Sequence, residues 1–283
     1  MQQATLITGV SSGIGLTTAH YLLQRGHTVY GSHRGGGPTT IGGAQELAKY
    51  PTFTPLTFDV TDRPAIRAAV QRIQEDGHQL TGVVNNAGIA ISGPVETLSE
   101  AQYRRQFDVN VFGLLAVCQE MLPLLHDARE AGLSPRIVNV GSVSGYLTSP
   151  FTTLYSASKF AVEALTDGMR RELHPFGIDV ISIAPGPVKT PIWAKGREQT
   201  EAYRGTRYEA VLEKLGPYTE AAEADGVEPE VVAEAIYKAL TDAKPKPNVL
   251  VMKRGWLVKL LRLTPKRFQD KFFLKRLAEN RRY

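Results

Sequence analysis

A glycine-rich turn near the start of this 283-residue chain constrains its fold more than any other feature. Residues 4–8 (ATLIT) are apolar and β-branched, as in a short buried strand. Residues 9–15 (GVSSGIG) follow, and residues 16–25 have the pattern of a helix that ends near Gly26. Such a turn lets backbone amides at a helix N-terminus approach a pyrophosphate. The spacing G-x-x-x-G-x-G therefore predicts a dinucleotide site in a first βαβ unit.

Strands and helices are expected to alternate through most of the chain. Further strands are predicted at 27–32, 53–60, 82–84, 135–139, 178–183 and 249–251, with helices at 63–76, 99–125, around 155–173 and at 229–240. This alternation predicts an α/β fold with a doubly wound parallel sheet of Rossmann type, covered by helices on both faces in three layers. No internal repeat or linker is visible, so residues 1–283 are expected to form a single domain.

Two segments stand apart from this pattern. Residues 191–228 are polar and punctuated by Gly and Pro, which indicates a helical lid over the active site. Residues 253–283 carry eleven Lys and Arg against Asp270 and Glu279, a net +9, so the other residues carry −4 of the total +5. This basic, amphipathic C-terminal extension can dock on the body by its apolar face or touch an anionic membrane surface. The charge is confined to the terminus without a recognition motif, which argues against nucleic-acid binding.

Composition is that of a soluble globular chain, with 42% hydrophobic and 22% charged residues. The single cysteine, Cys118, excludes an intramolecular disulfide framework and a Cys-based metal cluster, and its apolar neighbours indicate core packing. No leader pattern and no run of roughly 18 apolar residues is present. A cytoplasmic location is therefore expected.

Tyr155 and Lys159 are spaced to lie on one helix face, about one turn apart. A phenol titrates near pH 10, and an ammonium beside it favours the phenolate and lowers its pKa. The pair is then suited to move a proton to or from a reacting oxygen. The alternative is a Tyr/Lys pair on a solvated face, and only the rest of the chain decides between them.

The end of the second expected strand bears on cofactor choice. It has the sequence Ser32-His33-Arg34, without the acid that would bind the ribose 2′-hydroxyl of NAD. Arg34 can pair with a phosphate, which favours NADP(H) over NAD(H); the alternative is a solvated loop arginine. At the end of the third strand, before Val60, Asp59 can accept a hydrogen bond from an adenine amino group. Alternatively Asp59 caps the next helix, although Asp62 is the better N-cap.

Several motifs in order give the chain a family resemblance over roughly residues 5–190. They are Thr8-Gly9-x-x-x-Gly13-x-Gly15, Asn85-Asn86-Ala87-Gly88, Asn110, Ser142, Tyr155-x-x-x-Lys159 and Pro185-Gly186 with Thr190. With them the chain resembles the short-chain dehydrogenase/reductases in their single-domain form. Within that family it looks most like the retinol, 17β-hydroxysteroid and 3-hydroxybutyrate dehydrogenase branch.

The resemblance implies a role for each matching residue. Tyr155 would be the general acid or base, Ser142 would stabilise the substrate oxygen, and Lys159 would lower the phenol pKa and hold the nicotinamide ribose. Asn110 would hold a water that connects Lys159 to solvent; its alternative is a satisfied buried amide. Cofactor contacts would come from Gly9, Ser11, Ser12, Gly13, Ile14, Gly15, Arg34, Asp59, Val60, Asn86, Ala87, Gly88, Tyr155, Lys159, Pro185, Gly186, Val188 and Thr190.

The expected reaction interconverts a carbonyl and an alcohol with NADP(H). Apolar lid residues favour a steroid-, retinoid- or aromatic-ketone-like substrate, unless they only pack the lid on the body: Ile192, Trp193, Tyr203, Tyr208, Leu212 and Tyr218. A reductase of a small 3-oxo acid is one alternative. A non-catalytic NADP-binding sensor is another, although it would be expected to lose the tyrosine, lysine or serine. Relatives imply a homodimer or homotetramer built on the helices that carry Asn110 and Tyr155.

Overall fold

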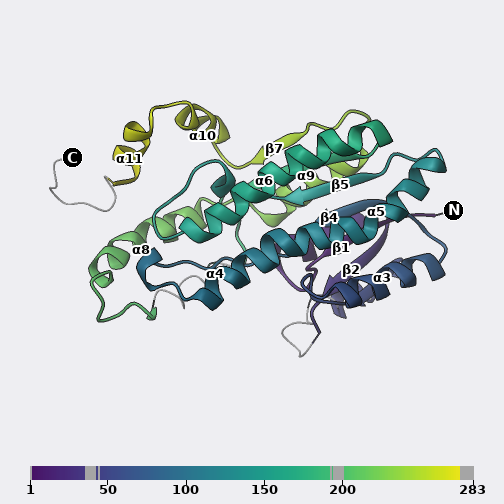
Figure 1. The fold of residues 1–283 in the computed structure, drawn as a ribbon, viewed down its shortest axis with the longest axis horizontal. Coiled ribbons are helices and arrows are strands. Elements are labelled where there is room, and N and C mark those ends of the chain that lie inside the picture. Colours follow the sequence, from purple (N-terminus) through teal and green to yellow (C-terminus); the bar gives the residue numbers. More distant parts are fainter. Residues whose placement is uncertain (1, 36–42, 44, 192, 194–200, 275–283) are drawn as a thin grey trace.

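The computed structural model describes residues 2–35, 43, 45–191, 193 and 201–274. Its centre is a seven-stranded sheet in the order β3-β2-β1-β4-β5-β6-β7, with every neighbouring pair parallel (Figure 1). The strands are β1 Gln3–Thr8, β2 Thr28–His33, β3 Phe53–Thr57, β4 Gln79–Asn85, β5 Arg136–Val140, β6 Asp179–Pro185 and β7 Asn248–Val251. The order reverses between β1 and β4, where ligands of such sheets bind beyond the carboxyl ends of the strands.

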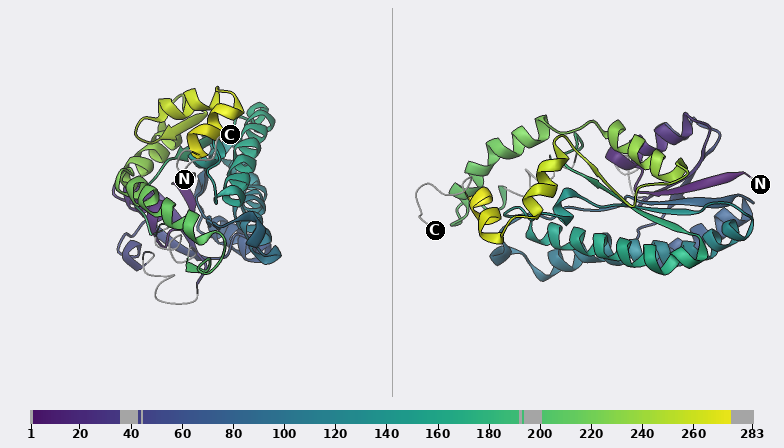
Figure 2. Two further views of the ribbon diagram at one scale, coloured as in Figure 1. Left: turned by 90° about the vertical axis from the view of Figure 1, so that its left-hand side faces the viewer. Right: turned by 90° about the horizontal axis from the view of Figure 1, so that it is seen from above.

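Helices cover both faces of the sheet, as the alternating pattern predicts (Figure 2). Helices α1 (Gly13–Leu23) and α9 (Pro229–Thr241) pack on one face, where Leu22 and Ile236 are fully buried. On the other face lie α3 (Arg63–Glu75), α5 (Leu114–Glu130) and α6 (Thr153–Leu173), with Ile73, Met121 and Val162 in the core. The predicted three-layer Rossmann-type fold is confirmed.

The helix predicted at 99–125 is interrupted where Asn110 lies. Helix α4 (Glu100–Phe107) opens with a capping box, which the spacing of Ser99 and Gln102 predicts and in which the two residues bond reciprocally. A wider π turn over Asp108–Gly113 then leads into α5. Such turns are rare and are frequent at functional sites. The continuous stretch Glu100–Glu130 is apolar and long enough to span a membrane, yet 61% of its apolar window is buried, as in a core helix.

Residues 201–228 of the predicted lid and residues 253–274 of the C-terminal extension lie beyond the carboxyl ends of the strands (Figures 1 and 2). The lid contains α8 (Glu209–Ala224), and the extension contains α10 (Gly255–Arg262) and α11 (Lys266–Leu274). Three short 3₁₀ turns, Val95–Thr97, Val143–Gly145 and His174–Phe176, complete the described elements. The loops that follow the strands and both added segments therefore lie at the end of the sheet where a ligand would bind.

Candidate functional site

The turn after β1 has the backbone that a phosphate cradle needs. Gly9 and Gly13 adopt left-handed φ values of +76° and +59°, which glycine tolerates at no steric cost. A Cβ at Gly15 would overlap the Gly9 carbonyl oxygen and the Asn86 side-chain amide. Only glycine fits at this third position, because the turn and the first turn of α1 approach each other so closely.

A hydrogen-bond network joins this turn to the loop after β4. The Asn86 Nδ2 donates to the carbonyl oxygens of Thr8 (2.9 Å) and Gly9 (3.1 Å). The backbone amides of Asn86 and Ala87 both donate to the Thr8 Oγ1 at 3.0 Å. The two loops therefore form one rigid unit at the switch point of the sheet. Two amides before a glycine at a strand end predict that the loops are tied together, which Asn86 confirms; its contact with the ribose stays a prediction.

The N-terminus of α1 is suited to an anion. Ser12 precedes the helix without a side-chain cap bond, and the first turn contains no acidic residue. The positive end of the helix dipole and the first amides then remain for a ligand phosphate. The segment Ser11–Gly15 therefore fits the pyrophosphate of a dinucleotide, as the spacing predicts.

The corner that is predicted to bind the adenosine contains two guanidinium groups and one carboxylate. Arg34 follows β2 and is exposed, and Asp59 follows β3. Burial alone would raise the pKa of Asp59, but hydrogen bonds from Thr61 and the nearby Arg105 and Arg34 outweigh it and lower the pKa. The Arg105 guanidinium lies 3.6 Å from the Asp59 carboxylate and was not anticipated, because it comes from α4.

The structure also shows which aspartate caps the next helix and how Val60 is oriented. Asp62 caps α3 by accepting a hydrogen bond from the Ala65 amide at 3.1 Å, as predicted. Val60 is 6% exposed and packs in the core beside Gly113. Only the backbone of Val60 is therefore placed to contact a cofactor.

Tyr155, Lys159 and Ser142 are brought together as the sequence predicts. Helix α6 carries Tyr155 and Lys159, and the Lys159 Nζ lies 5.8 Å from the centre of the Tyr155 ring. The same ammonium donates to the Val140 carbonyl oxygen at the end of β5, at 2.8 Å. Ser142 follows β5, where its hydroxyl accepts the Ser144 amide at 3.1 Å and hydrogen-bonds the phenol of Tyr155.

The pKa of the phenol differs from the predicted direction. Burial raises the pKa of Tyr155, and the bond with Ser142 opposes that rise only in part. Burial also lowers the pKa of Lys159 to about 8, against the attraction of Glu163. The predicted lowering of the Tyr155 pKa by Lys159 is wrong, because the ammonium points to the Val140 carbonyl and burial dominates.

Asn110 is a fully bonded buried amide, which was its alternative interpretation. Its Oδ1 accepts the Ile89 amide at 2.9 Å, and its Nδ2 donates to the Ile89 carbonyl (2.9 Å) and to the Ser158 Oγ (3.1 Å). Gln106, one turn earlier and also buried, accepts the Ile91 amide at 2.7 Å. The pair holds the loop after β4 against α6. Gln106 was missed, although its spacing of four from Asn110 places both amides on one helix face.

Glu163 is a half-buried carboxylate to which the sequence analysis gave no role. It accepts hydrogen bonds from the Tyr146 hydroxyl (2.9 Å) and the Ser182 hydroxyl (2.8 Å). A Cβ at Gly141 would overlap this carboxylate, and one at Gly145 would crowd its side chain. Burial raises the pKa of Glu163, while Ser182, Tyr146 and Lys159 oppose the rise. In the sequence, its position four residues after Lys159 indicated that the two side chains lie on one helix face.

The loop after β6 closes the other side of the glycine turn. A Cβ at Gly13 would lie 3.5 Å from the Thr190 side chain. Val188 pairs with Val227, and its carbonyl oxygen accepts the Trp193 indole N–H at 2.8 Å. Gly186 donates its amide to Val251 at 3.0 Å. Pro185 ends β6. The predicted cofactor residues of this loop therefore lie at the carboxyl ends of the strands, as the glycine turn does.

Part of the lid packs against the body, as the alternative interpretation held. Tyr203 is 8% exposed and its hydroxyl lies 3.4 Å from the Ser92 carbonyl oxygen. Tyr208 hydrogen-bonds Glu96 and packs edge-on against Phe151. Ile192 lies outside the described residues. In α8, Leu212 is half-buried and Tyr218 is exposed.

Comparison with known proteins identifies the family. A family model described as short chain dehydrogenase matches residues 3–201. The NADPH-dependent 3-dehydrocapnine reductase of Ornithobacterium rhinotracheale is 36% identical over 287 residues, covering 97% of each chain. The 3-ketodihydrosphingosine reductase of Bacteroides thetaiotaomicron is 36% identical over 188 residues, 66% of this chain and 65% of that protein.

A solved structure supports the same assignment. A short-chain dehydrogenase from Streptomyces avermitilis has a TM-score of 0.77 with 28% identity, and each chain covers 97% of the other. The proposed branch within the family stays a prediction. The chain belongs to the short-chain dehydrogenase/reductase family and is an oxidoreductase that acts on CH–OH groups with a nicotinamide cofactor.

Proposed function

We propose that this protein is an NADPH-dependent reductase of a keto group on a hydrophobic, sphingosine-like substrate. The observation that carries the reductase assignment is the convergence of Tyr155, Ser142 and Lys159 beside the glycine turn. The names of two relatives support the substrate class, since each denotes a reductase of a 3-keto or 3-dehydro compound. A steroid, a retinoid or a small 3-oxo acid remains the competing class.

In this proposal Tyr155 donates the proton to the carbonyl oxygen. Its raised pKa keeps the phenol protonated at neutral pH, which suits an acid in the direction of reduction. Because the Ser144 amide donates to the Ser142 oxygen, the Ser142 hydroxyl hydrogen is left to donate. Ser142 would then stabilise the charge that develops on the substrate oxygen.

The chain's own residues would position the cofactor, which supplies the hydride when bound. Gly9 and the segment Ser11–Gly15 would hold the pyrophosphate. The adenosine end would be held by Arg34, Asp59 and the Val60 backbone. Lys159 would hold the nicotinamide ribose together with the loop Asn86–Gly88. The loop that contains Pro185, Gly186, Val188 and Thr190 would orient the ring. Asn110 would hold the relay water through its backbone, since its side-chain amide already bonds protein groups.

Arg34 is expected to favour NADPH. A 2′-phosphate at this corner would compete with Asp59 for the guanidinium and would form charge-assisted bonds worth about 1.5–3 kcal/mol. Arg34→Glu should therefore lower the NADPH-to-NADH ratio of kcat/KM by about 10- to 100-fold. Lys246→Glu, an exposed charge reversal before β7 at the opposite edge of the sheet, is the matched control. An unchanged ratio in Arg34→Glu would show that Arg34 does not select between NADPH and NADH.

Glu163 is expected to keep Lys159 protonated during reduction. The charged and titratable groups around its carboxylate are Lys159 and Asp167 on α6, Tyr146, and Arg262 beyond Tyr146. Because Glu163 raises a Lys159 pKa that burial lowers to about 8, Glu163→Gln should move the alkaline limb of the kcat/KM profile to lower pH. Glu163→Asp should restore part of the shift. A uniform loss with an unshifted profile would show a purely structural role.

A graded panel of ketones tests the substrate proposal. NADPH absorbance would be followed with long-chain 2-amino-3-ketones, with the same chains lacking the amine, and with steroids, retinal and short 3-oxo acids. The proposal predicts the highest kcat/KM for a long-chain amino ketone. Preference for a short 3-oxo acid or a steroid would overturn the substrate class and leave the reductase assignment intact.

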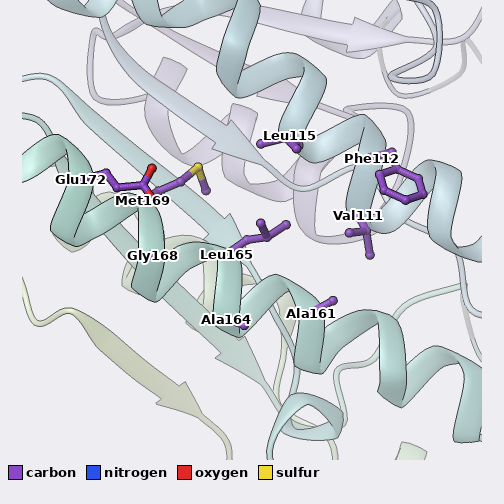
Figure 3. A pocket seen from close by; sticks show the side chains of 9 residues that line it. All are labelled: Val111, Phe112, Leu115, Ala161, Ala164, Leu165, Gly168, Met169 and Glu172. Atoms are coloured by element: carbon purple, nitrogen blue, oxygen red, sulfur yellow. The ribbon is translucent and has the colours of Figure 1, made fainter.

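An apolar pocket between two helices supports the proposed homo-oligomer (Figure 3). The side chains that line it come from the π turn and α5 on one side and from α6 on the other: Val111, Phe112, Leu115, Ala161, Ala164, Leu165, Gly168, Met169 and Glu172. Phe112 is 59% exposed and Phe160 is 41% exposed on the same helices. We propose that a second subunit covers this surface. We also propose that the protein forms a single domain and is cytoplasmic.

A further inference from the structure

The C-terminal helices expose an apolar surface that the proposed reaction does not use. Trp256 and Leu260 on α10 and Leu263, its C-cap residue, are spaced at i, i+4 and i+7 and are 64%, 55% and 83% exposed. Phe268 on α11 is 56% exposed. These four side chains are called the C-terminal apolar face. Isolated exposed apolar residues are ordinary on protein surfaces, but a contiguous stripe of this kind marks an interaction site.

Side chains outside this face hold α10 on the body and α11 on α10. The guanidinium of Arg262 lies 5.1 Å above the Tyr146 ring, and Val258 and Leu261 are half-buried. Gln269, which is 7% exposed, donates to the carbonyl oxygens of Leu261 (3.1 Å) and Thr264 (3.0 Å). This bonding fixes the corner between α10 and α11. The C-terminal apolar face is therefore not needed to hold the segment in place.

The segment that carries the face contacts two loops of the candidate active site. Tyr146, on which Arg262 packs, follows Ser142 by four residues. Met252, between β7 and α10, lies against Gly186 in the loop after β6. Figures 1 and 2 show α10 and α11 at the same end of the molecule as α8, beyond the carboxyl ends of the strands.

Positive charge surrounds the face. Residues 253–274 contain seven Lys and Arg against Asp270 alone. Lys253 pairs with Asp225 at the end of α8. Within the described part of the chain, Lys259, Arg267 and Lys271 are exposed and have no ion-pair partner. Apolar side chains flanked by free cations are the composition of a helix that lies in the interface of an anionic bilayer.

We infer that the C-terminal apolar face binds the surface of anionic lipid membranes. Trp256, Leu260, Leu263 and Phe268 enter the boundary between headgroups and acyl chains, while Lys259, Arg267 and Lys271 contact lipid phosphates. A second copy of the chain fits this surface poorly, because a two-fold contact would bring two strongly cationic segments together. The membrane contact does not depend on the substrate. The further consequence, delivery of a hydrophobic ketone from the membrane to the adjacent active site, rests on the proposed function.

Sedimentation with vesicles tests the inference on the full chain without substrate. Vesicles of phosphatidylcholine alone would be compared with vesicles of three parts phosphatidylcholine to one part phosphatidylglycerol. The wild type should sediment with the anionic vesicles, and less at high salt. Neutralising Lys259, Arg267 and Lys271 to Gln should weaken binding about fivefold for each charge removed. The triple variant Trp256→Ser, Leu260→Ser, Leu263→Ser should weaken it at least about tenfold.

Controls separate the inference from misfolding and from subunit contact. Val231→Ser with Phe176→Ser removes two exposed apolar side chains elsewhere (45% and 56% exposed) and should leave vesicle binding unchanged. NADPH binding by every variant reports on the fold. Failure of the wild type to sediment with anionic vesicles would overturn the inference. So would dissociation of subunits in the serine triple variant, measured by sedimentation velocity, because the face would then be a contact between copies.

Discussion

Replacing Tyr155 with phenylalanine is expected to lower kcat/KM for ketone reduction by about 10²- to 10⁴-fold, the usual contribution of a positioned general acid. The phenol is the acid beside Ser142, and phenylalanine preserves the ring over which the Lys159 ammonium lies. NADPH affinity should stay nearly unchanged, because the glycine turn and the loop after β4 are untouched. Steady-state kinetics and fluorescence titration with NADPH measure the two quantities separately.

A matched tyrosine provides the control for this prediction. Tyr103 lies on α4, is 43% exposed and takes no part in the candidate site, so Tyr103→Phe should keep wild-type turnover. If Tyr155→Phe also keeps its turnover, another group supplies the proton. The convergence around α6 would then no longer support the proposed mechanism.

Gly15→Ala is expected to have the second-largest effect, on the cofactor site and on folding together. The added methyl group would overlap the Gly9 carbonyl oxygen and the Asn86 amide, which is the group that ties the turn to the loop after β4. Overpacking of this kind costs about 1–3 kcal/mol of stability. Because the turn must open, NADPH affinity should fall by at least about tenfold, as expected when about 1.4 kcal/mol of binding free energy is lost.

Gly216 provides the matched control for that change. It lies inside α8, and a Cβ there would meet no atom within 4 Å. Gly216→Ala should therefore leave NADPH affinity unchanged. Thermal unfolding and NADPH titration of both variants check the pair. Normal NADPH affinity in Gly15→Ala would mean that the turn is not the cofactor cradle.

Local patterns predicted much of this molecule because the responsible interactions are local. The capping box of Ser99 and Gln102 and the N-cap of Asp62 depend on residues three positions apart. The parallel sheet followed from apolar strands that alternate with amphipathic helices. The pairing of Tyr155 with Lys159 followed from one helical turn. Each of these could be recognised in the sequence without knowing what packs against it.

What could not be predicted depends on contacts between distant elements. The π turn at Asp108–Gly113 has a sequence compatible with an ordinary helix, and the buried Asn110 is held by the Ile89 backbone on another element. The pKa of Tyr155 is set by burial, so helical spacing alone gave the wrong direction. The bonds of Glu163 require Tyr146 and Ser182 from two other segments.

Deuterium transfer from NADPH that carries two deuterium atoms at C4 of the nicotinamide tests the central claim most directly. The wild-type protein would be incubated with the labelled cofactor and a long-chain 2-amino-3-ketone, and the product would be analysed by mass spectrometry. The account predicts an alcohol that carries one deuterium on the former carbonyl carbon, formed by the wild type and not by Tyr155→Phe. Binding of NADPH with no deuterated alcohol from any ketone of the panel would contradict it and would favour a cofactor-binding sensor.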